Sequence, residues 1–231
     1  MTKKFALIWD IHSQATNCYN AVNYCVANGY TPVFLGDLFD SRTWDSDSVG
    51  VYKIAREAEE ELGAVIIASN HQDKLRRYLW GNPVDLSSAP ELIRTLEDFE
   101  SSGIDNQELN FWLSNLPYGF CFKEGGREYR CSHAYISALV PIPEYTNTHS
   151  VYYKDITQKT RSWMLYGKRT KEGNRVYWWE KPNLNPWIRV AGHYHVIHID
   201  LPNGNLVLDG NCGGGGQLPL YLVDKGELLL F

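Results

Sequence analysis

The sequence predicts a single α/β domain, and three observations lead to this prediction. The chain has 231 residues, which is enough for one substantial hydrophobic core. In its first third, short apolar runs alternate with stretches whose apolar residues recur at helical spacing. Each apolar run ends at aspartate, asparagine or histidine side chains. Strand, loop and helix in this order predict right-handed crossovers and a mostly parallel sheet.

The expected elements of this first third build the sheet. They are a strand at 5–9, a helix at 17–28, a strand at 31–35, an amphipathic helix at 47–62 and a strand at 64–68. The three strands lead to Asp10, to Asp37, and to Asn70 with His71. Because the carboxyl ends of parallel strands meet at one edge of a sheet, we expect these side chains to be neighbours.

The remainder of the chain is expected to be helical at first and then β. Helical spacing predicts helices at 72–80, 88–101 and 107–115. The turn Glu124-Gly125-Gly126-Arg127 predicts a hairpin of strands at 119–123 and 128–132, which leads to His133. A strand at 188–191 leads to Gly192-His193-Tyr194-His195, and three more short strands follow, with turns at 202–205 and 224–227.

Composition and charge exclude several classes of protein. Hydrophobic residues make up 44% of the chain, and no apolar run approaches the roughly 18 residues of a membrane span. The five cysteines form no C-x-x-C pair, which favours reduced thiols over a zinc or redox motif. The net charge of -5 gives no global sign of nucleic-acid binding. We therefore expect a cytoplasmic protein without a membrane segment, and the sequence leaves its oligomeric state open.

Aspartates, histidines and one asparagine gather in five short blocks. The blocks are Asp10-Ile11-His12, Gly36-Asp37-Leu38-Phe39-Asp40, Asn70-His71, His133 and Gly192-His193-Tyr194-His195. Carboxylate, imidazole and amide oxygen are ligands that suit Mn, Fe or Zn ions. Two such ions about 3.5–4 Å apart neutralise the charge of a phosphoryl group and activate a water molecule. The blocks therefore predict a dinuclear metal site for phosphoester hydrolysis.

The five blocks resemble those of the calcineurin-like metallophosphoesterase superfamily, which read D-x-H, G-D-x-x-D, G-N-H, H and G-H-x-H. They occur here in the same order between residues 10 and 195. The resemblance implies a metallophosphoesterase-like β-sandwich of two mixed sheets flanked by helices, formed by residues 1–231 as one domain. It also implies two divalent metal ions as cofactors, with Mn as the first choice and Fe, Zn or Ni as alternatives.

The same resemblance implies a role for each motif residue. By it, Asp10, His12 and His195 hold one metal, Asn70, His133 and His193 hold the other, and Asp37 bridges them. His71 is implied as the general acid, oriented by Asp40. The chemistry of these two side chains fits, because histidine can donate a proton near neutral pH and an adjacent carboxylate raises its basicity.

Further stretches resemble one branch of the superfamily, the bacterial protein-phosphatase-like branch. They are residues 70–75, 113–118, 165–167 and 208–216. The branch contains the lambda-type protein phosphatases, the diadenosine tetraphosphatase-like enzymes and the phosphatase domain of bacterial polynucleotide kinase phosphatase, which is the best match. In this branch the aspartate before the late glycine-rich run assists the site, which makes Asp209 a further candidate.

Departures from the branch pattern leave the substrate-binding residues open. The branch usually reads G-D-x-x-D-R-G, with an arginine that contacts substrate phosphate. Here Arg42 stands two residues after Asp40 rather than directly after it. Arg42 could reach the site from a shifted loop, or bases such as Lys74 and Arg76 could take its role. The plain alternatives are a solvent-facing Arg42 and a turn role for Asp209.

Residues 134–190 form an aromatic-rich segment that we expect to be a cap or insert over the site. Aromatic and basic residues are interleaved within 163–181. Such a mixture could stack nucleobases and hold phosphates, which predicts a local contact with nucleic acid. The alternative is a segment whose aromatic rings pack on the domain.

These observations lead to one expected function and two alternatives. We expect a metal-dependent phosphatase that hydrolyses phosphomonoesters on protein or nucleotide by a metal-activated hydroxide, without a covalent phosphoenzyme. A nucleotide phosphodiesterase or dinucleoside polyphosphate hydrolase is the first alternative, because a diester carries less charge to clamp. A metal-free binding module that kept only the fold is the second.

Overall fold

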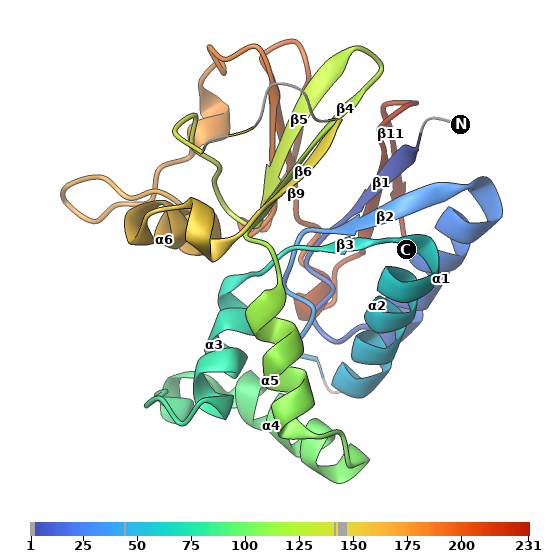
Figure 1. Ribbon diagram of the computed structural model, residues 1–231, viewed down its shortest axis with the longest axis vertical. Coiled ribbons are helices and arrows are strands. Elements are labelled where there is room, and N and C mark those ends of the chain that lie inside the picture. The colour runs from blue at the N-terminus through green and yellow to red at the C-terminus, as the bar shows by residue number, and fades with distance from the viewer. Residues whose placement is uncertain (1–2, 44, 141, 143–146) are drawn as a thin grey trace.

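The computed structural model describes residues 3–43, 45–140, 142 and 147–231 of the chain. Two mixed sheets face each other, and helices cover the outer face of the first sheet (Figure 1). This architecture confirms the predicted α/β class with two mixed sheets. Among the described residues, no helix is long and apolar enough to cross a membrane.

The first sheet contains the parallel strands that the sequence predicts. β1 (Lys4–Ile8), β2 (Tyr30–Phe34) and β3 (Val65–Ile66) run parallel, and β10 (Pro219–Leu222) and β11 (Glu227–Leu230) add antiparallel pairs on the other side of β1. The strand order is β11-β10-β1-β2-β3. The crossovers are α1 (Ala15–Asn28) and α2 (Ser48–Leu62), which end at left-handed glycines, Gly29 and Gly63.

Alternating side chains of β1 are buried on both faces of the sheet. Ala6 and Ile8 pack into the core beneath the helices, whereas Phe5, Leu7 and the following Trp9 pack between the two sheets. Successive side chains of a strand point to opposite faces, so a strand covered on both sides reads as a continuous apolar run.

A group of helices extends from the end of β3 (Figure 1). It consists of α3 (Asn70–Leu79), the short η1 (Leu86–Ser88), α4 (Pro90–Ser102) and α5 (Asn106–Asn115). Ser69 is the N-cap of α3, because its side chain accepts a hydrogen bond from the Gln72 N–H at 3.3 Å. Serine in place of the usual glycine before Asn70 therefore begins this helix.

The second sheet contains the predicted hairpin of β4 (Gly119–Glu124) and β5 (Arg127–Ser132). Its other strands are β6 (Thr148–Val151), β7 (Ile188–Ala191), β8 (Ile197–Asp200) and β9 (Asn205–Leu208), in the order β6-β4-β5-β7-β9-β8. The expectation of three short strands after His195 was wrong. The described residues form four there, because the two turns close complete hairpins, β8 with β9 and β10 with β11.

The segment 134–190 is partly built into the second sheet. It contributes β6, the short η2 (Tyr153–Asp155), α6 (Gln158–Tyr166) and η3 (Trp178–Glu180), while residues 141 and 143–146 lie outside the described part. Trp178 and Trp179 are buried with Tyr194, Ala191 and Val207 on the outer face of this sheet. For these two tryptophans the packing alternative is therefore the correct one.

Glu124 offers a test of the contact between β1 and β4. Its carboxylate accepts a hydrogen bond from the Phe5 N–H at 3.2 Å, yet burial raises the pKa of Glu124 from 4.5 to about 7. The folded state then holds this proton more tightly than the unfolded state does. Glu124 should therefore lower the free energy of unfolding as the pH rises from 4.5 through about 7.

We expect Glu124→Gln, which keeps the hydrogen-bond acceptor, to weaken this loss of stability at higher pH. Urea unfolding of both proteins at about pH 5 and about pH 8 measures the difference. An identical change in the free energy of unfolding for variant and wild type would contradict the prediction.

Candidate metal centre

A cavity of about 220 Å³ lies where the loops after β1, β2, β3 and β7 meet. Its lining residues are His12, Asp37, Arg42, Asn70, His71, Arg175, His193, His195, Asp209, Asn211 and Gly213. Three more of the candidate residues, Asp10, Asp40 and His133, are fully buried behind it. The loops that follow the strands thus bring their polar side chains to one place.

The backbone of these loops is held in an uncommon conformation. Residues of the site with a positive φ are Asp10 (44°), His12 (46°), Asp37 (48°), Asp40 (69°), His193 (72°), His195 (53°) and Asn211 (55°). Residues other than glycine rarely adopt this left-handed region. Each such residue costs of order 1–3 kcal/mol and persists only when the surrounding structure imposes it. Their concentration at one cavity indicates loops shaped for function.

Two glycines allow the loops to approach one another closely. At Gly36, with φ 97°, a Cβ atom would lie 2.6 Å from the Cβ of Ser69 and 3.0 Å from Nδ1 of His133. At Gly192, a Cβ atom would lie 2.5 Å from Trp9 Cδ1 and 2.8 Å from Asp10 Oδ2. Any side chain at either position would push these groups apart.

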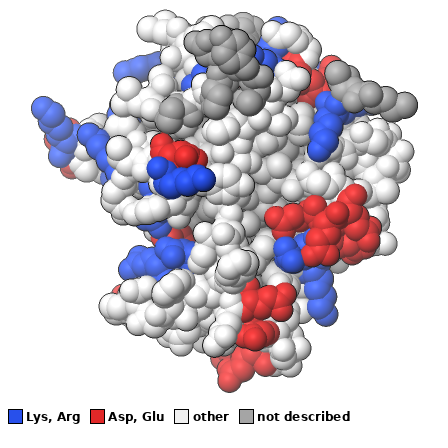
Figure 2. Space-filling view, in the orientation of Figure 1, with Lys and Arg blue, Asp and Glu red and all other residues white. Residues whose placement is uncertain are grey.

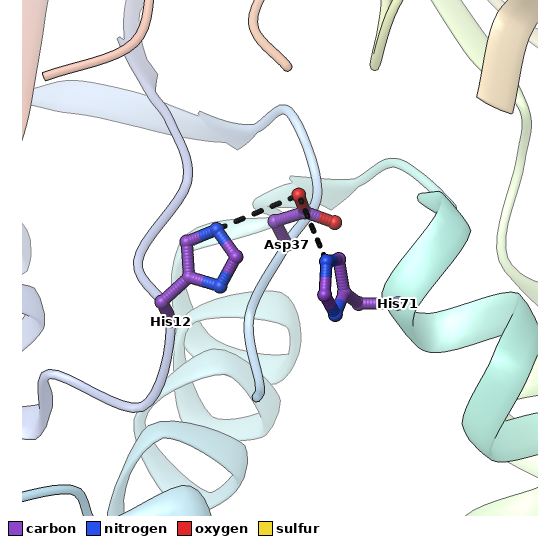
Figure 3. A group of neighbouring side chains, drawn as sticks. All are labelled: His12, Asp37 and His71. Carbon is purple, nitrogen blue, oxygen red and sulfur yellow. Dashed lines mark ion pairs between the residues drawn. The ribbon is translucent and has the colours of Figure 1, made fainter. Parts of the chain in front are cut away.

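Asp37 lies at the centre of the donor groups. Its Oδ2 is 3.6 Å from His12 Nε2, 4.0 Å from His71 Nε2 and 3.4 Å from His133 Nε2. Figure 3 shows the rings of His12 and His71 facing this carboxylate from two different elements. Donor atoms of His12, Asp37 and His71 lie within 4.8 Å of one another, and so do those of Asp37, His133 and His193. Asp37 belongs to both groups, so it could bridge two ions.

Asn70 and Asp10 lie beside the second of these groups. Asn70 Oδ1 is 2.7 Å from His133 Nε2, and His193 Nδ1 is 3.0 Å from the same nitrogen. Asp10 Oδ1 is 3.7 Å from His133 Nδ1, and Asp10 Oδ2 accepts a hydrogen bond from the His193 N–H at 2.9 Å. His195 is half exposed, with its Nδ1 3.6 Å from an oxygen of Asp209.

The donor set fits divalent cations. Among the described residues, Asp10 Oδ1 and Asp37 Oδ1 are buried without a hydrogen-bond partner. A buried acceptor left in this state costs about 1–3 kcal/mol unless another group coordinates it. The surrounding mixture of carboxylate, imidazole and amide oxygen suits Mn, Fe or Zn. A cation between these groups would satisfy both orphaned oxygens.

The protonation states also favour metal binding. Burial lowers the pKa of His12 and of His133, and burial together with His133 lowers the pKa of His193 to about 3. Burial opposes ionisation of Asp37, but the histidines around it hold its pKa below the usual range. Neutral imidazole and ionised carboxylate are the forms that bind a metal. Burial and Asp209 raise the pKa of Asp10, which a nearby cation would reverse.

His71 and Asp40 form a hydrogen-bonded pair beside the donor groups. His71 Nδ1 lies 2.7 Å from Asp40 Oδ2, which leaves Nε2 directed towards Asp37 and the cavity. Burial lowers the pKa of His71, but the carboxylates of Asp37 and Asp40 outweigh it, so the net direction is upward. A histidine held in this way can keep a proton near neutral pH and donate it into the cavity.

The candidate substrate-binding residues separate into two pairs. Arg42 and Asp209 line the cavity, whereas Lys74 and Arg76 are not among its lining residues. Arg76 instead pairs with Asp73, with 2.9 Å between Nη2 and Oδ1, and lines a separate cavity.

Sequence reasoning missed three lining residues, Arg175, Asn211 and Gly213. Arg175 lies in a loop after α6, with its guanidinium carbon 5.7 Å from the centre of the Tyr194 ring. No motif marks this arginine, and the interleaving of bases and aromatics in 163–181 was its only signal. Asn211 adjoins η4 (Cys212–Gly214) in the left-handed region, with φ 55°.

No family model matches the chain, but it is similar to several known proteins. A bis(5'-nucleosyl)-tetraphosphatase (asymmetrical) of Oceanobacillus iheyensis is 27% identical over 220 residues, which cover 89% of this chain and 79% of that protein. A solved structure described as a candidate diadenosine tetraphosphatase has a TM-score of 0.63 at 17% identity, covering 100% of this chain and 94% of that one. A metallophosphoesterase from Sphaerobacter thermophilus has a TM-score of 0.50 at 10% identity, covering 99% and 87%. These likenesses confirm the metallophosphoesterase-like fold.

Metal binding can be tested without an activity assay. Asp37→Asn removes the charge that both donor groups share, so we expect it to abolish or strongly weaken Mn²⁺ binding. Calorimetric titration of metal-free protein should give about two ions per wild-type chain and fewer for the variant. His149→Gln, a histidine on β6 outside all five blocks, serves as the control. Equal stoichiometry and affinity for Asp37→Asn and wild type would contradict the assignment.

Proposed function

We propose that this phosphoric ester hydrolase, which resembles the calcineurin-like metallophosphoesterases in fold and in its five sequence blocks, hydrolyses phosphomonoesters of nucleotides or proteins. The observation that carries the proposal is the pair of donor groups sharing Asp37, in and directly behind one cavity, together with the His71–Asp40 pair. Two divalent ions, when bound, neutralise phosphoryl charge and activate a water molecule.

The proposed ligands divide into two sets around Asp37. Asp10, His12 and His195 belong to one set, and Asn70, His133 and His193 to the other. His71 also lies near Asp37, but at 4.0 Å it is the most distant of the three rings whose Nε2 faces Oδ2. Its Nδ1 is engaged by Asp40, which supports an acid role rather than a ligand role.

His71 would act on the leaving group. Asp40 holds Nδ1 of the ring, so the proton that can be transferred is the one on Nε2, on the cavity side. Transfer of this proton to the leaving oxygen lets the alcohol depart uncharged. The ring then carries no charge until it takes up another proton from water.

Two arginines support a phosphoryl substrate with high negative charge. Arg42 and Arg175 reach the cavity from different loops, one after β2 and one after α6. Guanidinium groups pair well with phosphate oxygens, and two of them suit the dianion of a terminal phosphate. The main argument for a diester substrate, a missing arginine, is therefore weaker.

Both carboxylate oxygens of Asp209 accept hydrogen bonds from the backbone of neighbouring loops. Its Oδ2 accepts a hydrogen bond from the His195 N–H at 2.6 Å, and its Oδ1 accepts one from the Asn211 N–H at 2.9 Å. Both carboxylate oxygens are thus occupied by the loops that they join. We propose that Asp209 orients His195 instead of contacting substrate.

Dinucleoside polyphosphate hydrolysis is the second candidate. The observation that favours it is the name of the relative from Oceanobacillus iheyensis, which is 27% identical. Such a substrate needs the same metal-activated water and the same clamp on phosphoryl oxygens. The two candidates therefore differ in what lies beyond the reacting phosphorus.

A contact of 163–181 with nucleic acid stays a prediction. Tyr166 and Tyr177 of this segment are exposed, whereas Trp178 and Trp179 are buried. On the face seen in Figure 2, acidic side chains gather over α2 and basic ones are scattered. The described residues of that face show no extended basic groove of the kind that binding along a nucleic-acid backbone requires.

The deciding experiment compares three substrates with added Mn²⁺: p-nitrophenyl phosphate, bis-p-nitrophenyl phosphate and diadenosine tetraphosphate. Manganese-dependent turnover of the monoester that Asp37→Asn abolishes would support the proposal. Much faster turnover of diadenosine tetraphosphate would favour the second candidate. No turnover of any substrate with any divalent ion would refute both and favour the metal-free binding module.

Arg175→Gln tests the proposed clamp. We expect it to lower kcat/KM for p-nitrophenyl phosphate by about 10- to 100-fold, because one charged hydrogen-bond donor to phosphate is lost. Mn²⁺ binding should be unchanged. Arg169→Gln is the matched control, since the exposed Arg169 side chain donates to the Gly173 carbonyl within its own loop and does not line the cavity. Equal activity of both variants would remove Arg175 from the site.

A further inference from the structure

We propose that two consecutive residues of α4, Arg94 and Thr95, position the acid and the phosphate-binding arginine of the site. The inference rests on the proposed hydrolase function and assigns neither residue a contact with substrate. α4 packs against α2 and supplies none of the motif residues. Its contacts with the loop after β2 nevertheless reach both functional groups of that loop.

Thr95 holds Asp40 by two hydrogen bonds. Its hydroxyl donates to Asp40 Oδ1 at 2.8 Å and accepts from the Asp40 N–H at 3.2 Å. The other carboxylate oxygen, Oδ2, faces His71 Nδ1 at 2.7 Å. Thr95 and Asp40 are both about 1% exposed, so water does not compete for these bonds. The hydroxyl thereby sets the plane of the carboxylate and, through it, the direction of the His71 ring.

The backbone of Asp40 makes this support necessary. Its φ of 69° lies in the left-handed region, which a residue other than glycine adopts only under external constraint. Thr95 binds the amide and the carboxylate of the same strained residue. Without the hydroxyl, the carboxylate could rotate and the pair with His71 would lengthen.

Arg94 holds the segment around Arg42. Its Nη1 donates to the Thr43 carbonyl at 2.9 Å, and its Nη2 donates to the Ser41 carbonyl at 2.5 Å. These two carbonyls flank Arg42, whose own N–H donates to the Gly213 carbonyl at 2.9 Å. The backbone on both sides of Arg42 is therefore fixed while its side chain lines the cavity. Arg94 thus supports an arginine that stands one position later than the branch pattern expects.

Helix geometry explains why neighbours in sequence can do both tasks. Successive residues of an α-helix point about 100° apart. Thr95 is buried and meets Asp40, whereas Arg94 runs along the loop to Ser41 and Thr43. One turn of α4 therefore positions the acid His71 and the phosphate-binding Arg42 by separate contacts, and variants should separate the two effects.

Thr95→Val tests whether Thr95 positions His71 through Asp40, because valine has the same shape without the hydroxyl. We expect kcat for phenyl phosphate to fall about tenfold or more, and kcat for p-nitrophenyl phosphate to fall less than about threefold. Phenolate is the more basic leaving group and depends more on protonation. Thr95→Ser restores the hydroxyl and should recover most of the loss. Equal losses on both substrates, or a serine variant as impaired as the valine variant, would overturn the positioning role of Thr95.

Arg94→Gln tests whether Arg94 positions Arg42 for phosphate binding. We expect KM for p-nitrophenyl phosphate to rise about tenfold, with kcat and the dependence on the leaving group close to wild type. The double variant Arg94→Gln/Arg42→Gln should be no worse than Arg42→Gln alone, because Arg94 acts through Arg42. Fully additive losses would overturn the positioning role of Arg94, and so would loss of bound Mn²⁺ in Arg94→Gln.

The same assays distinguish failure of this inference from failure of the proposed function. Wild type without metal-dependent turnover would refute both. Wild type with turnover, together with an Asp40→Asn variant impaired mainly on phenyl phosphate, would uphold the acid. If Thr95→Val then matched wild type on both substrates, only the positioning role would fail.

Discussion

The burial of Asp37 among histidines is the constraint on which the remaining structure depends. A carboxylate taken out of water is costly unless opposite charge or hydrogen bonds surround it. Here one of its oxygens has imidazole nitrogens of three histidines within 4.0 Å, and the other is orphaned. Divalent cations, when bound, would supply the missing charge. The rings come from the loop after β1, from α3 and from the end of β5, so the site holds both layers together.

The strained loops around Asp37 require a rigid framework. Seven site residues with positive φ together store several kcal/mol, which only a well-packed scaffold can offset. The scaffold is the core between the sheets, where Trp9, the residue before the first block, is fully buried. Gly36 and Gly192 then bring the loops closer than any side chain would allow. The packed core thus provides the stability that offsets the strained backbone of the loops.

Several elements could be predicted from the sequence because their signal is local. β1 and β2 read as continuous apolar runs since both faces are covered, and each is followed by a motif aspartate. β6 and α6 were missed because their segment mixes aromatic and basic residues without a clear period. The two turns after His195 were predicted, but a strand of four residues is too short to show a clear alternation of apolar and polar side chains. One of the four strands was therefore missed.

By itself, the sequence determined the α/β class, the order of the five aspartate- and histidine-containing blocks and the resemblance to metallophosphoesterases, because each depends on residue types at short spacing. Only the tertiary structure decided that Arg175 joins the cavity while Arg76 turns away to Asp73. It also decided that Thr95 and Arg94 reach the loop of Asp40 from a helix more than 50 residues away. Side-chain contacts between distant segments follow from the packing of helices and sheets, which no local pattern encodes.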